Sequence, residues 1–490
     1  MSEQRSYRQI MKATSIFGGV QVIQILVQII RSKAIAILLG PAGMGINSLL
    51  TSTLGLMQSL TNFGLKTSAV KNVAEANGTE NSNRVTVIIT VLRRWVWITG
   101  LLGTILTLIL SPWLSELTFG NREYTLAFIW ISVSLFFNQL SSGQLVILQG
   151  LRKIRYLANA NLTGAFLGLF VTIPMYYFWG VDGIVPAIIG MSIANLLRTW
   201  YFARKIKLEK VEVTRKTTLV EGKQMLIMGF LLSMSGLMTT GAAYILRIYI
   251  SNTGGVDQVG LYSAGFAIIN TYVGMVFTAM GTDYYPRLSA VAGDDTKATQ
   301  TINQQAEITL LILAPILVVF MVFINWVIIL LYSTQFTSVN GMIQWAALGM
   351  YFKAASWSIS FILLAKGASK LFFWNELIAN IYLLVFNVLG YKYGGLEGLG
   401  ISFLAAYFVY LVQVFFFSRI KYNFSFGKNF IKIFTIQVVL GVLGFLIVKY
   451  TTEPVSYILG SMVILVSGLY SLWELNKRLD LKGIFNKLKK

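Results

Sequence analysis

Long apolar stretches recur along the whole chain and are separated by short polar or glycine-rich connections. About 20 residues of helix cross the hydrocarbon core of a bilayer, and each stretch is at least that long. The segments are 10–39, 44–74, 85–111, 124–150, 154–179, 183–206, 223–251, 259–289, 303–332, 340–366, 369–391, 396–419, 429–450 and 455–475. The pattern predicts an all-α polytopic membrane protein with about 14 transmembrane helices.

The composition agrees with a membrane protein and excludes several kinds of chemistry. Hydrophobic residues make up 56% of the 490 residues and charged residues 12%, with a mean hydropathy of +0.68. A soluble globular chain carries about 25% charged residues. Cysteine and histidine are both absent, which excludes disulfides, thiolate or imidazole metal sites and catalysis by a Cys nucleophile or a His base. There is no Walker motif, and we expect no cofactor.

Positive charge alternates between the connections and predicts the orientation of the chain. The side of the N-terminus carries Arg5, Arg8, Lys12, Arg152, Lys153, Arg155, Arg204, Lys205, Lys207, Lys210, Arg215, Lys216, Lys223, Arg419, Lys421, Lys428, Lys432 and the tail bases from Lys477 to Lys490, against Arg122, Lys392 and Lys449 on the other. We expect both termini in the cytoplasm and the protein in a bacterial inner membrane. The net charge of +21 then reflects topology and the anionic bilayer surface, and no nucleic-acid partner is expected.

Two glycine-rich connections recur at one offset and indicate an internal repeat. Gly40 and Gly255 each open a turn with a second glycine five residues later, and Gly180 and Gly395 open two further turns. The two pairs have the same separation along the chain. Six helices return a chain to its starting side, so this offset predicts two parallel six-helix lobes, a transporter architecture. The predicted boundaries are 1–215 and 216–425, with 426–490 as an appended helix pair and basic tail. Coincidence among short turns is the alternative.

Several of these connections resemble one family of transporters. The resemblance rests on Leu39 to Gly45 after Arg31 and Lys33, Phe119 to Asn121, Ala243 to Ile245 before Arg247, Asp257 to Gly260, and Leu364 to Ala368 followed by Glu376. In order and spacing they resemble Wzx-type polysaccharide flippases, with the lipid III flippases of enterobacterial common antigen as the most similar subgroup. The resemblance covers the first twelve helices.

The resemblance implies a non-enzymatic, alternating-access transporter of the multidrug/oligosaccharidyl-lipid/polysaccharide exporter (MOP) superfamily. Its substrate would be an undecaprenyl-pyrophosphate-linked oligosaccharide, carried from the cytoplasmic to the periplasmic leaflet for O-antigen, capsule or common-antigen biosynthesis. Glycosyltransferases and a polysaccharide polymerase would be its partners. The resemblance does not specify the glycan.

Ionisable residues within the spans are the candidate site residues, because such residues usually face a cavity or a partner. Arginine and lysine suit a pyrophosphate, and the basic candidates are Arg31, Lys33, Lys66, Lys71, Arg247, Arg287 and Lys353. The acidic candidates for ion coupling are Glu376, Asp283 and Glu307. Snorkelling to the headgroups is the alternative for a base such as Lys66, and a salt bridge is the alternative for an acid such as Asp283, one turn from Arg287.

Two other functions are kept as alternatives. A cation-coupled multidrug exporter of the same superfamily would carry embedded acids and few bases, whereas bases dominate here. A membrane glycan polymerase or ligase would carry a long catalytic outer loop. The longest outer connection expected here has about a dozen residues, between Leu110 and Tyr124.

Overall fold

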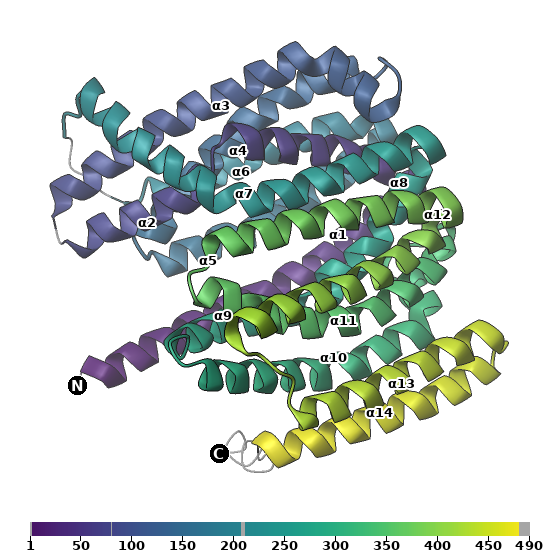
Figure 1. The fold of residues 1–490 in the computed structure, drawn as a ribbon. Coiled ribbons are helices and arrows are strands. Elements are labelled where there is room, and N and C mark those ends of the chain that lie inside the picture. Colours follow the sequence, from purple (N-terminus) through teal and green to yellow (C-terminus); the bar gives the residue numbers. More distant parts are fainter. Residues whose placement is uncertain (1, 80, 207–210, 480–490) are drawn as a thin grey trace. The chain divides into compact units, whose positions relative to one another are not determined.

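The computed structural model describes residues 2–79, 81–206 and 211–479, and the regular elements in these ranges are all helical (Figure 1). In chain order they are α1 (Ser2–Thr61), α2 (Leu65–Gly78), α3 (Ser82–Phe119), α4 (Thr125–Gly150), α5 (Ile154–Trp179), η1 (Gly180–Gly183), α6 (Ile184–Ala203), α7 (Arg215–Gly254), α8 (Val256–Ala267), η2 (Ile268–Val273), α9 (Met275–Ala290), α10 (Asp295–Leu331), η3 (Thr334–Val339), α11 (Asn340–Ala365), α12 (Ser369–Tyr422), α13 (Lys428–Tyr450) and α14 (Val455–Leu479). The predicted all-α class is confirmed.

Ten helical runs within the described ranges are long and apolar enough to cross a membrane, or eleven if the bent helix α7 counts as one span. Three of these runs, Ile23–Thr61, Ile154–Ala203 and Ser369–Tyr422, contain 39, 50 and 54 residues. About 20 residues suffice for one crossing, so each of the three is long enough for two. The count of fourteen remains a prediction.

The four glycines of the predicted repeat lie at breaks between helical segments. Gly40 (φ 63°, ψ −170°) interrupts α1, and Gly255 (φ 86°, ψ 170°) separates α7 from α8. Gly180 (φ 54°, ψ −129°) and Gly395 (φ 54°, ψ −137°) form the other pair. Glycine adopts positive φ without the steric cost that a Cβ brings. The members of each pair have nearly the same backbone conformation and the two pairs share one sequence offset, which supports an internal duplication.

One predicted helix end is wrong. The apolar pattern ended a helix near residue 111, before Pro112, but α3 continues through Pro112 to Phe119. Proline is tolerated inside transmembrane helices, where neighbouring groups compensate for the missing backbone hydrogen bond. The outer connection between α3 and α4 is therefore only Gly120 to Tyr124, shorter than the dozen residues expected. This removes the space for a catalytic loop at that point.

Two compact units make up the chain, Met1–Gly260 and Leu261–Lys490. In unit 1, one core cluster joins α2, α3 and α4, and a second joins α1, α3, α4, α5 and α6. In unit 2, a cluster joins α9, α10, α11 and α12, while α13 and α14 lie side by side and pack on α10 (Figure 1). The lobe boundaries 1–215, 216–425 and 426–490 remain a prediction.

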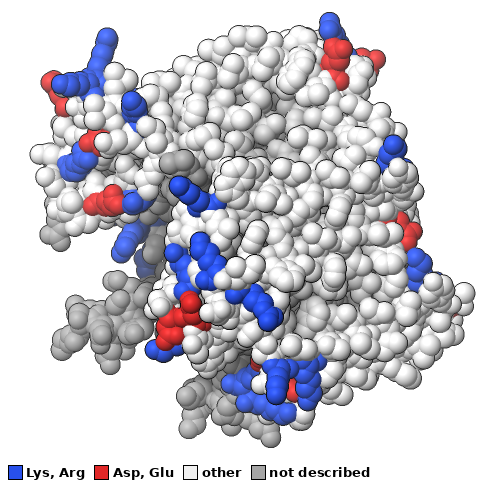
Figure 2. All heavy atoms as spheres, viewed as in Figure 1, with Lys and Arg blue, Asp and Glu red and all other residues white. Residues whose placement is uncertain are grey.

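The surface has the character expected of a lipid-embedded protein. Large apolar side chains such as Phe170, Leu330 and Leu469 are at least 66% exposed. Lysine and arginine gather toward helix ends, and broad areas between the ends carry no charge on the face shown in Figure 2. Lipid-facing helices expose apolar residues because there is no water at that depth. Lys207, Lys210 and the basic tail from 480 to 490, which entered the orientation argument, lie outside the described residues.

Candidate functional site

Two helix interruptions meet in unit 1. The chain leaves helical geometry between α1 and α2, where Phe63 (φ 48°) and Gly64 (φ 63°) are left-handed. Helix α7 bends by 54° between Arg215–Phe230 and Ser233–Gly254. A Cβ added to Gly64 would overlap the carbonyl oxygen of Gly229 in α7. Discontinuous helices in contact are characteristic of transporter binding sites, because unwound backbone lines a cavity there.

A basic hollow lies beside this interruption. It has a volume of about 390 Å³ and lies between the start of α2, the end of α4 and the start of α5. Lys66 and Arg152 supply its positive charge, and Gln149 and Asn161 supply amides. Arg152 has a left-handed backbone (φ 53°). Non-glycine residues with positive φ are uncommon and cluster at functional sites, and Arg152 places one of them in the lining of this hollow.

The candidate Arg31 lies against helix α5. Its guanidinium interacts with the hydroxyl of Tyr176, and its Nη1 is 3.9 Å from the position of a Cβ added to Gly168. Its Nε is buried and has no hydrogen-bond partner among the described residues. Lys33, two residues on, is half-buried. Arg31 therefore keeps one donor for a ligand or a bound water.

The other two basic candidates of unit 1 differ in their surroundings. Arg247 bridges α7 to α1, since its Nε donates to the Ser48 hydroxyl at 3.3 Å and its Nη1 to the Ala243 carbonyl at 3.0 Å. Lys71 is exposed and pairs with Glu75 at 3.5 Å, one turn further along α2. The structure therefore brings Lys66, and not Lys71, to the basic hollow.

In unit 2 the candidate Lys353 lies among amide and aromatic groups. Its Nζ donates to Asn270 Oδ1 at 3.2 Å. The ring centroids of Phe277, Phe403 and Tyr407 lie 5.9, 5.7 and 5.1 Å from Nζ, within the distance of a cation–π interaction. Within the described part of unit 2, Lys353 has no ion pair. An ammonium held in this way keeps its positive charge uncompensated.

Asn270 itself lies in a helix interruption. It belongs to η2, a single π-helical turn that separates α8 from α9, in which the Gly274 amide donates to the Ile269 carbonyl. Such turns inside helices occur frequently at functional sites. The amide that holds Lys353 is therefore placed by an irregular turn.

The acidic candidate Glu376 lies on α12 among hydroxyl and amide groups. Tyr410 donates to Glu376 Oε1 at 3.0 Å, and Asn375 Nδ2 is 3.4 Å from the same oxygen. The Tyr382 hydroxyl, which lacks a hydrogen-bond partner among the described residues, lies in electrostatic range of Glu376. The sequence also suggested a carboxylate–ammonium pair between Glu376 and a base of the same cavity, such as Lys353. The structure gives these two residues different partners, so the pair with Lys353 is not formed.

Asp283 and Arg287 lie near the end of α9. Asp283 is 84% exposed and its Oδ2 is 3.8 Å from Arg287 Nε, while Arg287 Nη2 donates to Gln305 on α10 at 2.7 Å. The salt bridge considered as the alternative for Asp283 is present. Their roles in coupling and binding remain predictions.

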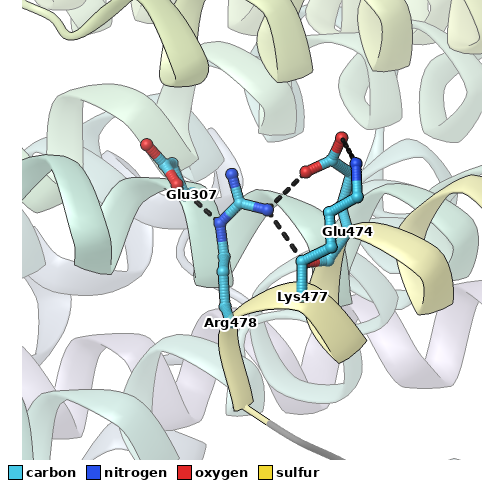
Figure 3. Close-up of polar contacts among 4 residues, drawn as sticks. All are labelled: Glu307, Glu474, Lys477 and Arg478. Carbon is cyan, nitrogen blue, oxygen red and sulfur yellow. Dashed lines mark hydrogen bonds and ion pairs between the residues drawn. The ribbon is translucent and has the colours of Figure 1, made fainter.

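The third acidic candidate, Glu307, is buried in α10 and belongs to an ion-pair network with α14 (Figure 3). Arg478 Nε donates to Glu307 Oε2 at 2.8 Å, and Arg478 Nη1 also binds Glu474. Lys477 Nζ is 3.6 Å from Glu474. Two carboxylates are thus neutralised by two bases, which favours a structural role for Glu307.

Sequence reasoning missed part of this arrangement. Arg152 was used only as a marker of orientation, and Gln149 and Asn161 were not considered. The signal available in the sequence was the Asn62–Phe63–Gly64 run inside an apolar segment, since such residues favour turns. The aromatic and amide partners of Lys353 come from separate helical elements and leave no local sequence signal.

With this geometry in place, comparison with solved structures shows which known fold the chain has. The fold matches that of the lipid II flippase MurJ in its inward closed conformation with a TM-score of 0.68 over 96% of this chain and 99% of that chain, at 13% identity. It also matches an inward-facing multidrug resistance MATE family transporter of the MOP superfamily with a TM-score of 0.63 over 82% of this chain and 94% of that chain, at 15% identity. The chain has the fold of a MOP-superfamily membrane transporter.

Sequence comparison then gives the family. Residues 34–341, more than half of the chain, match the polysaccharide biosynthesis protein family, and the chain belongs to it. A putative O-antigen transporter of Shigella flexneri is 25% identical over 74% of this chain and 87% of its own length. The lipid III flippase of Escherichia coli is 20% identical over 77% of this chain and 90% of its own length.

Proposed function

We propose that the protein is a flippase that moves undecaprenyl-pyrophosphate-linked oligosaccharides from the cytoplasmic to the outer leaflet of the inner membrane, for surface polysaccharide biosynthesis. The observation that carries this proposal is the basic hollow of unit 1, formed by Lys66, Arg152, Gln149 and Asn161. Charged Arg and Lys donors bind phosphate oxygens strongly, and amides suit sugar hydroxyls. The relatives named as an O-antigen transporter and a lipid III flippase support the same substrate class.

The location of the hollow also supports this function. The predicted orientation places the turn between α4 and α5 on the cytoplasmic side, where the substrate would be loaded. Both termini would then be cytoplasmic, and glycosyltransferases and a polymerase would act before and after transport. Lys353, an ammonium without an ion pair in the described part of unit 2, supplies a second site for the pyrophosphate during alternating access.

The test is a flipping assay in proteoliposomes that contain a fluorescent lipid-linked oligosaccharide and equal amounts of protein. Lys66→Gln and Arg152→Gln should each lower the apparent affinity roughly ten- to hundredfold, because a charge-assisted hydrogen bond contributes about 1.5–3 kcal/mol. Arg155→Gln is the matched control, since Arg155 is exposed near the same turn and does not line the hollow. Absence of flipping by the wild-type protein would refute the proposed function.

A further inference from the structure

A second hollow, in unit 2, is lined mainly by uncharged polar groups. It has a volume of about 340 Å³ and lies where α10 and α13 end and where α11 and α14 begin. Its polar lining consists of Asn325, Asn340, Gln344, Thr451, Glu453 and Tyr457, together with the buried Ser456. Ligand pockets commonly have volumes of about 300–1,000 Å³, so this hollow can hold a small polar molecule.

One acceptor in this hollow has no partner. Asn340 Nδ2 donates to Asn325 Oδ1 at 3.1 Å, but Asn340 Oδ1 is buried without a hydrogen bond among the described residues. Leaving a buried acceptor without a hydrogen bond is energetically unfavourable. A hydroxyl group of a bound ligand would remove that cost.

An aromatic ring and a carboxylate complete the lining. The Tyr457 ring stacks on Phe323 with a centroid distance of 5.6 Å, and its hydroxyl donates to Glu453 Oε1 at 2.5 Å. Phe323 is also the residue at which α10 leaves helical geometry (φ −103°, ψ 18°). The residues on either side of this break, Val322, Ile324 and Asn325, line the hollow.

The charge of the hollow indicates what it would bind. The residues that line it include a carboxylate and no lysine or arginine. Lys449, next to the lining residue Val448, already pairs with Glu397 at 3.2 Å and lies over the Trp345 ring. A phosphate would therefore meet no free cation here. Amides, hydroxyls, a carboxylate and an aromatic ring together suit a neutral polyhydroxylated ligand.

We infer that this hollow is a sugar-binding subsite that holds part of the substrate's glycan at the outer end of unit 2. That the bound sugar belongs to the transported substrate rests on the proposed function. The predicted orientation places these helix ends on the outer side of the membrane. The subsite is separate from the basic hollow of unit 1 and binds hydroxyl groups in place of phosphate. It gives helices α13 and α14 a role in handling the glycan.

The experiment uses the full chain in lipid nanodiscs and, as the probe, the glycan released by mild acid from the producing cells' lipid-linked oligosaccharides. Binding is measured by saturation-transfer NMR and calorimetry. The wild type should bind, and Gln344→Ala and Glu453→Gln should each weaken binding about five- to tenfold, the loss of about one hydrogen bond. Asn340→Ala tests the unpaired acceptor. Gln335→Ala is the matched control, because Gln335 is exposed in η3 and outside the hollow.

Three results would overturn the inference. The first is no glycan binding by the wild type, and the second is equal binding by the wild type and by folded Gln344→Ala and Glu453→Gln variants. Glycerophosphoethanolamine is the competing probe, and the third result, displacement of the glycan by it at lower concentration, would assign the hollow to a phospholipid headgroup. Flipping measured in parallel separates the two proposals. Flipping without glycan binding refutes the subsite alone, whereas glycan binding without flipping refutes the proposed function.

Discussion

Gly45 and Gly260, whose separation along the chain equals that of Gly40 and Gly255, pack backbone to backbone within unit 1. A Cβ added to Gly260 would lie 2.9 Å from the Gly45 nitrogen and overlap the Pro41 carbonyl oxygen, and a Cβ added to Gly45 would overlap the Val256 carbonyl oxygen. Pro41 and Val256 have the same separation. Gly45 therefore contacts Val256, and Gly260 contacts Pro41, the residue equivalent to Val256 in the first repeat. This reciprocal pattern is that of a two-fold symmetric contact. This reciprocal contact supports a duplication with parallel repeats.

The reciprocal contact predicts that a methyl group at either glycine destabilises the protein. Gly45→Ala and Gly260→Ala should each cost about 1–3 kcal/mol, since the backbone must move to make room. The thermal midpoint in detergent, followed by size-exclusion fluorescence, measures this. Gly55→Ala in the same helix α1 is the control, because a Cβ there has nothing within 4 Å. Equal midpoints for all three variants would show that the contact is not tight.

The interruption at Gly64 predicts a variant with impaired transport. Gly64→Ala combines positive φ with overlap on Gly229, and a left-handed backbone alone costs a non-glycine residue roughly 1–2 kcal/mol. We expect slower flipping and a lower thermal midpoint, because α2 can no longer approach α7. Gly78→Ala, at the open end of α2, should leave both unchanged. If Gly64→Ala flips the substrate at the wild-type rate, the interruption at Gly64 is not required for transport.

Lys353 predicts a variant that loses transport and keeps its stability. Lys353→Met removes a charge that has no ion pair with any residue the structure describes, so the thermal midpoint should stay or rise, because an embedded charge is costly. Flipping should fall roughly ten- to hundredfold if the ammonium binds phosphate, and Lys353→Arg should retain part of it. Lys428→Met, an exposed base at the start of α13, is the control. A large loss of stability with normal specific activity would make Lys353 structural.

Glu376 predicts a change in the pH dependence of transport. The carboxylate is held by Tyr410 and Asn375 without an ion pair in the described residues, so a proton can bind and leave without breaking a salt bridge. Glu376→Gln fixes a neutral group, and we expect slower flipping with a flatter pH profile. Glu123→Gln, in an exposed turn, should keep the wild-type profile. If Glu376→Gln also keeps the wild-type pH profile, polymerisation on the outer side is the favoured driving force.

Variants in the ion-pair network around Arg478 should lower the stability of the protein without reducing the transport activity of the protein that remains folded. Removing one partner of a buried ion pair costs about 3–5 kcal/mol, and Arg478→Ala should cost less, because its side chain is 21% exposed. Lys477→Ala, with a side chain 48% exposed, should cost below about 1 kcal/mol. Thermal midpoints test both. The Glu307→Gln/Arg478→Met double variant should recover part of the loss, since neither member of the pair is left charged without the other.

The sequence predicted best the features that depend on residues close together in the chain. Apolar length predicted the helical class, and the pairs Gly40/Gly255 and Gly180/Gly395 predicted four breaks between helical segments, all of which have positive φ. The predicted helix end at residue 111 was wrong because α3 continues through Pro112, and lipid-embedded helices tolerate proline. The partners of Lys353 and Glu307 could not be predicted, because Asn270 lies 83 residues from Lys353 and Arg478 lies 171 residues from Glu307. Such pairings depend on how distant helices pack, which leaves no periodic signal in the chain.

The pairing of Glu307 with Arg478 also has a consequence for how the chain is made in the cell. A ribosome adds about 5–20 residues per second, so Arg478 emerges on the order of ten to thirty seconds after Glu307. During that interval helix α10 carries a carboxylate whose partner has not yet been synthesised. Among the described residues, the base that pairs with Glu307 comes from α14, so this ion pair forms only after α14 has been synthesised. Polypeptides released before α14 would be recognisable to membrane quality-control proteases by this unneutralised charge.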